Sequence, residues 1–338
     1  MIKYCELWIF AVTMLSSLGY GDEIKNNVVT SVDVFPREVE MCDSIYFSVN
    51  YLNNTDYPIE SGLHHGFVFT NPDAFVLKCF IVVGGRTWEF IPYVPFIATA
   101  DFFGKPDLPP KSCVRYCYKI RVPDLENLQD SFWSDLSSNL SRESKEVILQ
   151  IVLGTHHEFQ TIKSGSKLLI FNEKLKIKPR NDKEMNIITS WYKNTPVEIL
   201  PIPHPINTQS TYSISKRKID RDYRVFLRKT GIDDRLQFIL RLGDRYPYYP
   251  NLPEDWQGWK KLEESFEAST LRDEIRWTRI CVQYCTTGDD KVLDELKTWL
   301  EKMNPIQRSV MVNYFHKNEK LPNSDKLYET IQLFKDKK

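Results

Sequence analysis

The chain has 338 residues, 42% of them hydrophobic, which is enough for about two domains that each bury a core. Its 45 basic and 45 acidic residues balance, and residues 206–338 hold 25 basic and 21 acidic residues, so neither half carries a large net charge. A nucleic-acid-binding protein would carry a basic stripe or a pI well above neutral, so we expect no nucleic-acid partner.

The first 21 residues have the pattern of a secretory signal peptide. Lys3 supplies a positive charge, residues 7–18 form an apolar stretch, and Gly19 and Gly21 offer small residues for cleavage. The alternative is that this segment forms a buried N-terminal strand or helix. Because a spanning helix needs roughly 20 apolar residues, we expect an exported protein, whether periplasmic, cell-surface or secreted, with no stable membrane span after cleavage.

Residues 22–180 are expected to form an antiparallel β-sandwich. Apolar and polar residues alternate along short segments that end in Pro, Gly or Asn turns, a pattern typical of half-buried strands. The expected strands cover residues 44–52, 74–83, 86–91, 113–121, 147–153 and 168–178. Between the fourth and fifth of these, Leu125, Leu128, Phe132 and Leu136 recur at helical spacing, which predicts a helical insertion near residues 124–144.

Two segments of this region resemble a known family. Residues 44–51 lead into Asn53-Asn54-Thr55, and residues 108–112, with the letters L-P-P-K-S, precede another expected strand. These segments resemble the immunoglobulin-like domains of exported bacterial proteins. The resemblance implies an immunoglobulin-like sandwich and a location outside the cytoplasm, but it implies no activity.

Cysteine usage is sparse for an exported chain. Cys5 lies in the expected signal peptide, which leaves six cysteines in the mature protein, an even number that permits disulfides. Cys113 and Cys117 would stand about 13 Å apart along a strand, too far to bridge each other. Zinc sites favour tighter C-x-x-C turns, so small buried apolar cysteines are the preferred interpretation.

A proline-rich run over Thr195–Gln209 separates two regions of different pattern. Its prolines exclude both a helix and an inner strand. The segment just before it, Asn181–Lys193, carries apolar residues at helical spacing. We therefore expect residues 181–215 to form a short helix followed by an ordered, extended strap.

Residues 216–338 are expected to form an all-α domain, either a compact bundle or a short solenoid, because apolar residues recur at helical spacing. Thr270 with Asp273 resembles a capping box, Asp289 and Ser324 are expected to cap helices, and Pro305 is expected to begin one. Acidic pairs such as Glu263-Glu264 are expected on solvated helix faces or caps. The predicted fold class is thus α+β with segregated domains.

Two His-His pairs form the first candidate site. Both pairs are expected at strand ends, and a neighbouring glutamate could complete a transition-metal site if these ends meet. The candidate ligands are His64, His65, His156, His157 and Glu158. The alternative is that these histidines are solvated or cap turns.

An aromatic loop and the helix after it form the second candidate site. Exposed Tyr and Trp side chains offer large contact areas that suit sugars or proline-rich peptides. The candidate binding residues are Tyr246, Tyr248, Tyr249, Trp256 and Trp259. The alternative is that these rings pack beneath the helices or against the sandwich.

None of the common nucleophile, phosphate-loop, dinucleotide or zinc-protease motifs is present in the sequence. The expected function is therefore an exported, non-enzymatic binding or scaffold protein of the cell envelope that recognises a protein or glycan partner, without a cofactor. The alternative is a metal-dependent hydrolase or metal-binding protein that uses the two His-His strand ends.

Overall fold

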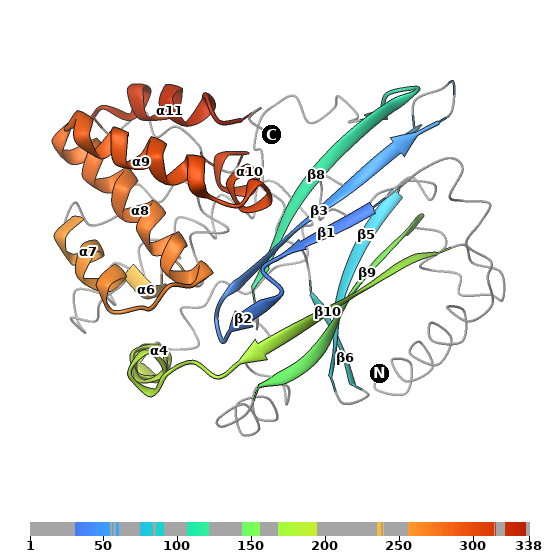
Figure 1. Ribbon diagram of the computed structural model, residues 1–338, viewed down its shortest axis with the longest axis horizontal. Helices are drawn as coiled ribbons and strands as arrows, with labels where there is room; N and C mark the ends of the chain where they lie inside the picture. The colour runs from blue at the N-terminus through green and yellow to red at the C-terminus, as the bar shows by residue number, and fades with distance from the viewer. Residues whose placement is uncertain are drawn as a thin grey trace, which may run out of the picture.

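The computed structural model describes residues 31–54, 56, 59–60, 75–83, 86–90, 107–121, 144–155, 168–194, 235–237, 239, 256–313, 315 and 322–335. In this part of the chain the fold is mixed α+β, with the strands first and the helices after them (Figure 1). The strands are β1 (Ser31–Phe35), β2 (Glu38–Glu40), β3 (Ser44–Asn53), β4 (Ile59–Glu60), β5 (Phe75–Val83), β6 (Arg86–Phe90), β7 (Asp107–Leu108), β8 (Ser112–Arg121), β9 (Lys145–Thr155) and β10 (Leu169–Lys178). The helices are α4 (Asp182–Asn194), α6 (Arg235–Gln237), α7 (Trp256–Glu264), α8 (Thr270–Thr287), α9 (Asp290–Lys302), α10 (Pro305–Asn313) and α11 (Ser324–Gln332).

The longer strands form two sheets. One has the order β1-β3-β8, and the other has the order β2-β10-β9-β5-β6; β4 and β7 form a separate small pair. The strands expected over residues 74–83 and 86–91 pair with each other, since Val83 of β5 is the partner of Arg86 of β6. The expectation of antiparallel pairing throughout is wrong at one place: β2 pairs with β10 in parallel. The chain reaches β2 because it crosses from one sheet to the other between β1 and β2, over Pro36 and Arg37.

One hydrophobic core lies between the two sheets. Alternate residues of β3, including Phe47 and Tyr51, point into the same cluster as Leu149 and Ile151 of β9. The ring of Tyr118 on β8 stacks on Phe47 with 5.1 Å between centroids. The alternation predicted for β3, β8 and β9 is therefore confirmed, because period-2 patterning places every second side chain on the buried face.

Part of the opposite face of the β1-β3-β8 sheet is buried as well, against the helices. Helix α10 contacts all three strands. Tyr46, fully buried on this face of β3, packs with Ile306 and Val310 of α10, and Cys117 of β8 is half-buried beside them. A face that is mixed in polarity along the sequence is therefore an internal interface.

The helices begin where local chemistry favours it. Asp289 caps α9, since its side chain accepts from Lys291 N–H at 3.0 Å, and Pro305 is the first residue of α10, as predicted. The prediction that Thr270 caps α8 is wrong by one residue, because Ser269 accepts from Arg272 N–H at 3.2 Å. Asn323, not Ser324, precedes α11, and it makes no side-chain cap bond.

Helix α4 confirms the short helix predicted just before the proline run. Ile188 of α4 packs in the same cluster as Trp259, Leu262 and Phe266, whereas Met185 contacts both this cluster and the core between the sheets. The first helix after the sheets thus joins the sheet region to the helical region.

Several predictions lie outside the described residues. These are the signal peptide at residues 1–21, the insertion at residues 124–143, the proline-rich strap and most of residues 216–255. Among the helices that the structure describes, none combines the length and apolar character needed to span a bilayer.

Candidate functional site

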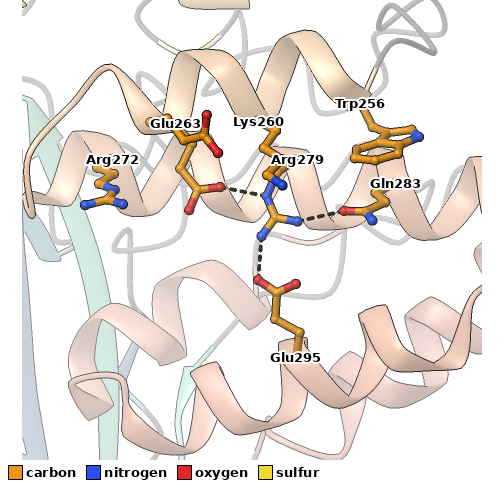
Figure 2. A pocket seen from close by; sticks show the side chains of 8 residues that line it. Trp256, Lys260, Glu263, Arg272, Arg279, Gln283 and Glu295 are labelled. Carbon is orange, nitrogen blue, oxygen red and sulfur yellow. Dashed lines mark hydrogen bonds and ion pairs between the residues drawn. The ribbon is translucent and has the colours of Figure 1, made fainter.

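A polar pocket of about 410 Å³ opens between α7, α8 and α9 (Figure 2). It is lined by Trp256, Lys260, Glu263, Glu264, Arg272, Arg279, Gln283 and Glu295. Six of these eight side chains are charged, and the only aromatic ring among them is that of Trp256. The pocket is therefore suited to a polar ligand rather than to an apolar one.

The lining residues share helix faces because of their spacing. On α7, Trp256, Lys260 and Glu263 are separated by four and three residues, so they lie on one face, while Trp259 and Leu262 on another face enter the core. On α8, Arg272, Arg279 and Gln283 follow the same rule. The apolar face of each helix is thus buried, and the polar face of each borders the pocket.

Arg279 is held in place by three side chains, one from each helix around the pocket. Its Nε donates to Glu263 Oε2 at 2.6 Å, its Nη1 to Gln283 Oε1 at 2.7 Å and its Nη2 to Glu295 Oε1 at 2.5 Å (Figure 2). Arg276 also donates to Glu295, at 3.2 Å. Burial on its own would raise the pKa of Glu295, but the two arginines together lower it, so this carboxylate stays ionised.

Two cations at the pocket take no part in the hydrogen bonds and ion pairs around Arg279. Lys260 is exposed and Arg272 is half-buried, and neither side chain makes a hydrogen bond or ion pair with any residue that the structure describes. Gln283 uses its carbonyl oxygen to hold Arg279, so its amide N–H groups remain able to donate. The pocket therefore combines a fixed ionic network with donors that are available to a ligand.

A second ionic cluster lies between the sheet and the helices. Glu274 of α8 is buried and accepts hydrogen bonds from Ser44, Tyr46 and Arg121, and Lys119 Nζ lies 3.5 Å from its carboxylate. All four partners of Glu274 come from β3 or β8. Since the carboxylate oxygens are bound by the protein's own donors, we assign this cluster to structure rather than to a site.

A third cluster surrounds Arg180, which follows β10. Its guanidinium binds Asp43 at 2.8 Å, Glu184 at 2.6 Å and the carbonyl oxygen of Met41 at 2.8 Å. Arg180 has no exposed side-chain surface, and its ring contact is with Phe266, 5.8 Å from the guanidinium carbon. This cluster is also closed to ligands.

The structure separates the predicted aromatic residues. Trp256 is partly buried and lines the pocket, whereas Trp259 is fully buried among α4, α7 and α8, which matches the alternative of a packed ring. The other three predicted binding residues, Tyr246, Tyr248 and Tyr249, lie outside the described residues.

The predicted metal ligands His64, His65, His156, His157 and Glu158 also lie outside the described residues. Over the ranges that the structure does describe, no three His, Cys, Asp or Glu side chains are grouped so as to hold a metal ion.

All six cysteines after residue 21 are described, and none of them is in a disulfide. Cys42, Cys79 and Cys285 are buried, as the interpretation of small apolar cysteines predicts, while Cys113 is exposed. Burial raises the pKa of Cys42 and of Cys285 to about 11. Such thiols stay protonated near neutral pH and are poor nucleophiles.

Sequence reasoning missed the centre of the pocket. Glu263 was expected on a solvated face, but it is only 8% exposed, because Arg279 binds it. The available signal was the polar stripe Arg272, Arg279 and Gln283 on α8, opposite its apolar face. Spacing shows that these residues share a face, but it does not show which helices approach that face.

No protein-family model matches the sequence, and no curated protein matches it. Among solved structures, the chain is similar to a Niemann-Pick type C2 protein from Japanese carpenter ant, with 9% identity and a TM-score of 0.24 over 45% of this chain and 91% of that chain. It is also similar to the C-terminal domain of wzt, with 6% identity and a TM-score of 0.23 over 46% of this chain and 73% of that one. At TM-scores this low we infer neither a fold family nor a function from these similarities.

Proposed function

We propose that this chain is an exported, non-enzymatic binding or scaffold protein of the cell envelope, and that its pocket between α7, α8 and α9 recognises a glycan. The observation that carries the proposal is the position of Trp256 beside a rigid set of hydrogen-bonding side chains. The C–H face of a sugar ring is apolar and packs on an aromatic ring, while its hydroxyls need several donors and acceptors.

The polar lining supplies both kinds of group. Glu263 and Glu295 retain acceptor capacity, because each carboxylate oxygen has two lone pairs and only some are used by the arginines. Gln283 offers its amide N–H groups as donors. Since Arg279 fixes all three side chains before a ligand arrives, little side-chain entropy is lost on binding.

The alternative ligand is a protein partner, which the array experiment below would reveal as binding to peptides instead of glycans. The metal-dependent alternative depends on the two His-His pairs, which lie outside the described residues, so no observation in the structure favours it.

An immunoglobulin-like sandwich is part of the proposal. The order β10-β9-β5-β6 corresponds to the G-F-C-C′ sheet of variable-type domains, and β1-β3-β8 corresponds to the first three strands of their A-B-E-D sheet. This correspondence supports the resemblance found in the sequence. It concerns the fold alone, because immunoglobulin-like domains serve many functions.

Export is expected to show in the N-terminus of the mature protein. If residues 1–21 are a cleaved signal peptide, protein recovered from its host will begin at Asp22. N-terminal sequencing measures this directly, and a product that still begins at Met1 would contradict the export proposal.

Replacing Trp256 by alanine is expected to weaken glycan binding at least tenfold, about 1.4 kcal/mol, because the sugar loses its stacking surface. A glycan array, with a peptide array beside it, finds the ligand, and calorimetry then measures its affinity for each variant. Trp256→Phe keeps an aromatic face and is expected to retain most of the affinity.

Tyr328→Ala is the matched control for this experiment, because it truncates a half-buried aromatic residue on α11 that does not line the pocket. Circular dichroism confirms that each variant is folded. If Trp256→Ala binds as tightly as the parent chain, or if only peptides bind, the glycan proposal is wrong.

A further inference from the structure

We propose that the pocket selects anionic saccharides, meaning oligosaccharides whose rings carry a carboxylate or a sulfate. This inference depends on the proposed function, since it names the charge of the glycan that the pocket binds. It follows from how the charged side chains around the pocket are paired.

Four of the charges cancel one another. Arg279 binds Glu263 and Glu295, and Arg276 contacts the same two carboxylates, at 3.8 Å and 3.2 Å. Two guanidinium groups and two carboxylates thus form a closed, neutral ring beside the pocket. A ligand meets this ring as a set of hydrogen-bonding groups and not as a net charge.

Lys260, Arg272 and Glu264 are the remaining charged residues of the lining, so the lining and Arg276 together carry one excess positive charge. Neither cation is paired with a residue that the structure describes, and Lys260 is exposed at the edge of the pocket. The planar guanidinium of Arg272 suits carboxylate and sulfate groups, because it can donate two parallel hydrogen bonds to either.

The side chains that line the pocket form an elongated row. Figure 2 shows Arg272 and Trp256 at opposite ends of the row of side chains, with Lys260 and Arg279 between them. Arg272 and Gln283 are eleven residues apart on α8, which corresponds to about 16 Å along the helix axis. A ligand that reaches both ends is therefore an oligosaccharide, with one ring against Trp256 and an acidic group near Arg272.

The small number of unpaired cations disfavours an acidic peptide as the occupant. Only Lys260 and Arg272 lie outside the neutral ring, and Glu264 lies beside them, so a chain of closely spaced acidic residues would find too few cations to pair with. Sugar hydroxyls, in contrast, donate to carboxylates, and an acidic oligosaccharide carries only about one charge per ring. The mixed lining therefore matches a sparsely charged, hydroxyl-rich ligand.

The test compares four probes by calorimetry on the full mature chain: a uronic-acid oligosaccharide, its neutral methyl ester, a sulfated oligosaccharide of the same length, and an oligoglutamate peptide. We expect the parent chain to bind the uronate or the sulfated probe at least tenfold more tightly than the ester. Whichever of the two binds more tightly identifies the acidic group. This preference is expected to shrink as salt is added, because exposed charges are screened.

The double variant Lys260→Gln/Arg272→Gln is expected to lose this preference while it still binds the neutral ester through Trp256. The control Lys291→Gln/Lys302→Gln removes the same charge from exposed positions of α9 that do not line the pocket, and it is expected to keep the preference.

Three results would overturn the inference: equal affinity of the parent chain for acid and ester, tightest binding of the peptide, or an unchanged preference in the Lys260/Arg272 variant. Equal affinity for acid and ester, with binding still dependent on Trp256, would leave the proposed function standing. Absence of any saccharide binding would overturn both.

Discussion

Replacing Glu274 by glutamine is expected to lower the free energy of unfolding by about 3–5 kcal/mol, the usual cost of removing one partner from a buried ion pair. Glu274 is the only carboxylate within 4 Å of either Arg121 or Lys119 among the described residues. Both cations are buried, so they would lose the charge of Glu274 without gaining water. The glutamine has the same shape, so the loss measures charge rather than packing.

Urea denaturation of the two proteins measures this difference. Asp294→Ala is the control, because it breaks a surface ion pair with Lys297 in which the side chains of Lys297 and Asp294 are 43% and 73% exposed, and such pairs contribute about 0–1 kcal/mol. If the Glu274→Gln variant were as stable as the parent chain, the charge of Glu274 would not stabilise the fold, and the prediction would be wrong.

The stabilisation that the Glu274 carboxylate supplies is expected to depend on pH. Burial on its own would raise the pKa of Glu274, but the charges of Arg121 and Lys119, together with its hydrogen bonds, lower it from the ordinary value of 4.5 to about 2. Because the folded-state pKa is the lower one, the stabilisation is complete above the unfolded-state pKa and is lost as the pH falls towards 2.

Two half-buried carboxyl groups oppose this trend. Burial raises the pKa of Asp273 and of Glu40, so the pH profile of the parent chain is a sum of contributions with both signs. The difference between the parent chain and Glu274→Gln isolates one group, and we expect it to shrink as the pH is lowered through the acid range. A difference that stays constant would show that the charge of Glu274 does not stabilise the fold.

Replacing Arg180 by methionine is expected to cost a similar amount, about 3–5 kcal/mol. The methionine would leave the carboxylates of Asp43 and Glu184 buried without their cation, and the carbonyl oxygen of Met41 without a donor. Asp43 also accepts from the N–H of Leu271 at 3.0 Å, so the start of α8 would lose support as well.

Equilibrium denaturation again supplies the measurement, with Arg37→Met as the matched control. The side chain of Arg37 is 59% exposed and pairs with Glu173 at the surface, so its loss is expected to cost less than about 1 kcal/mol. Arg180→Lys is expected to lie between the two, since lysine keeps the charge but lacks the planar fork that reaches three partners. Equal stability of the lysine variant and the parent chain would show that charge alone matters at this position.

Local patterns predicted the elements well. The alternation in β3 placed Phe47 and Tyr51 on the core face, and Asp289 and Pro305 marked the starts of α9 and α10. These predictions succeeded because each depends on residues within a few positions of one another. Two-residue periodicity and helix caps are short-range effects.

The burial of the other face of the same sheet could not be predicted from local patterns. Tyr46 and Arg121 belong to the mixed-polarity side of their strands, and both are buried by helices that follow far along the chain. Ser44 and Thr270 exchange two hydrogen bonds across 226 residues of sequence. Nothing in the local pattern of β3 distinguishes a face that meets water from one that meets a helix.

The residues of the pocket could be predicted only in part, because local patterns do not show which segments come into contact. Trp256 was identified from its residue type and lines the pocket, but Trp259 has the same residue type and is buried. Arg279 was missed because its partners Glu263 and Glu295 lie on two other helices. A residue whose role is set by contacts between helices carries no signal in its own segment.

Because part of the second face of the β1-β3-β8 sheet is buried against the helices, the helical region is not an interchangeable module. Joined to a different sheet, its Glu274 would meet neither Ser44 nor Arg121 and would be a buried carboxylate without a partner. If the sheet lost the helices, Tyr46 and Lys119, which the helices now cover, would be exposed to water. We therefore expect the two regions to be inherited together, and a change at Glu274 to be tolerated in evolution only alongside a compensating change at Arg121.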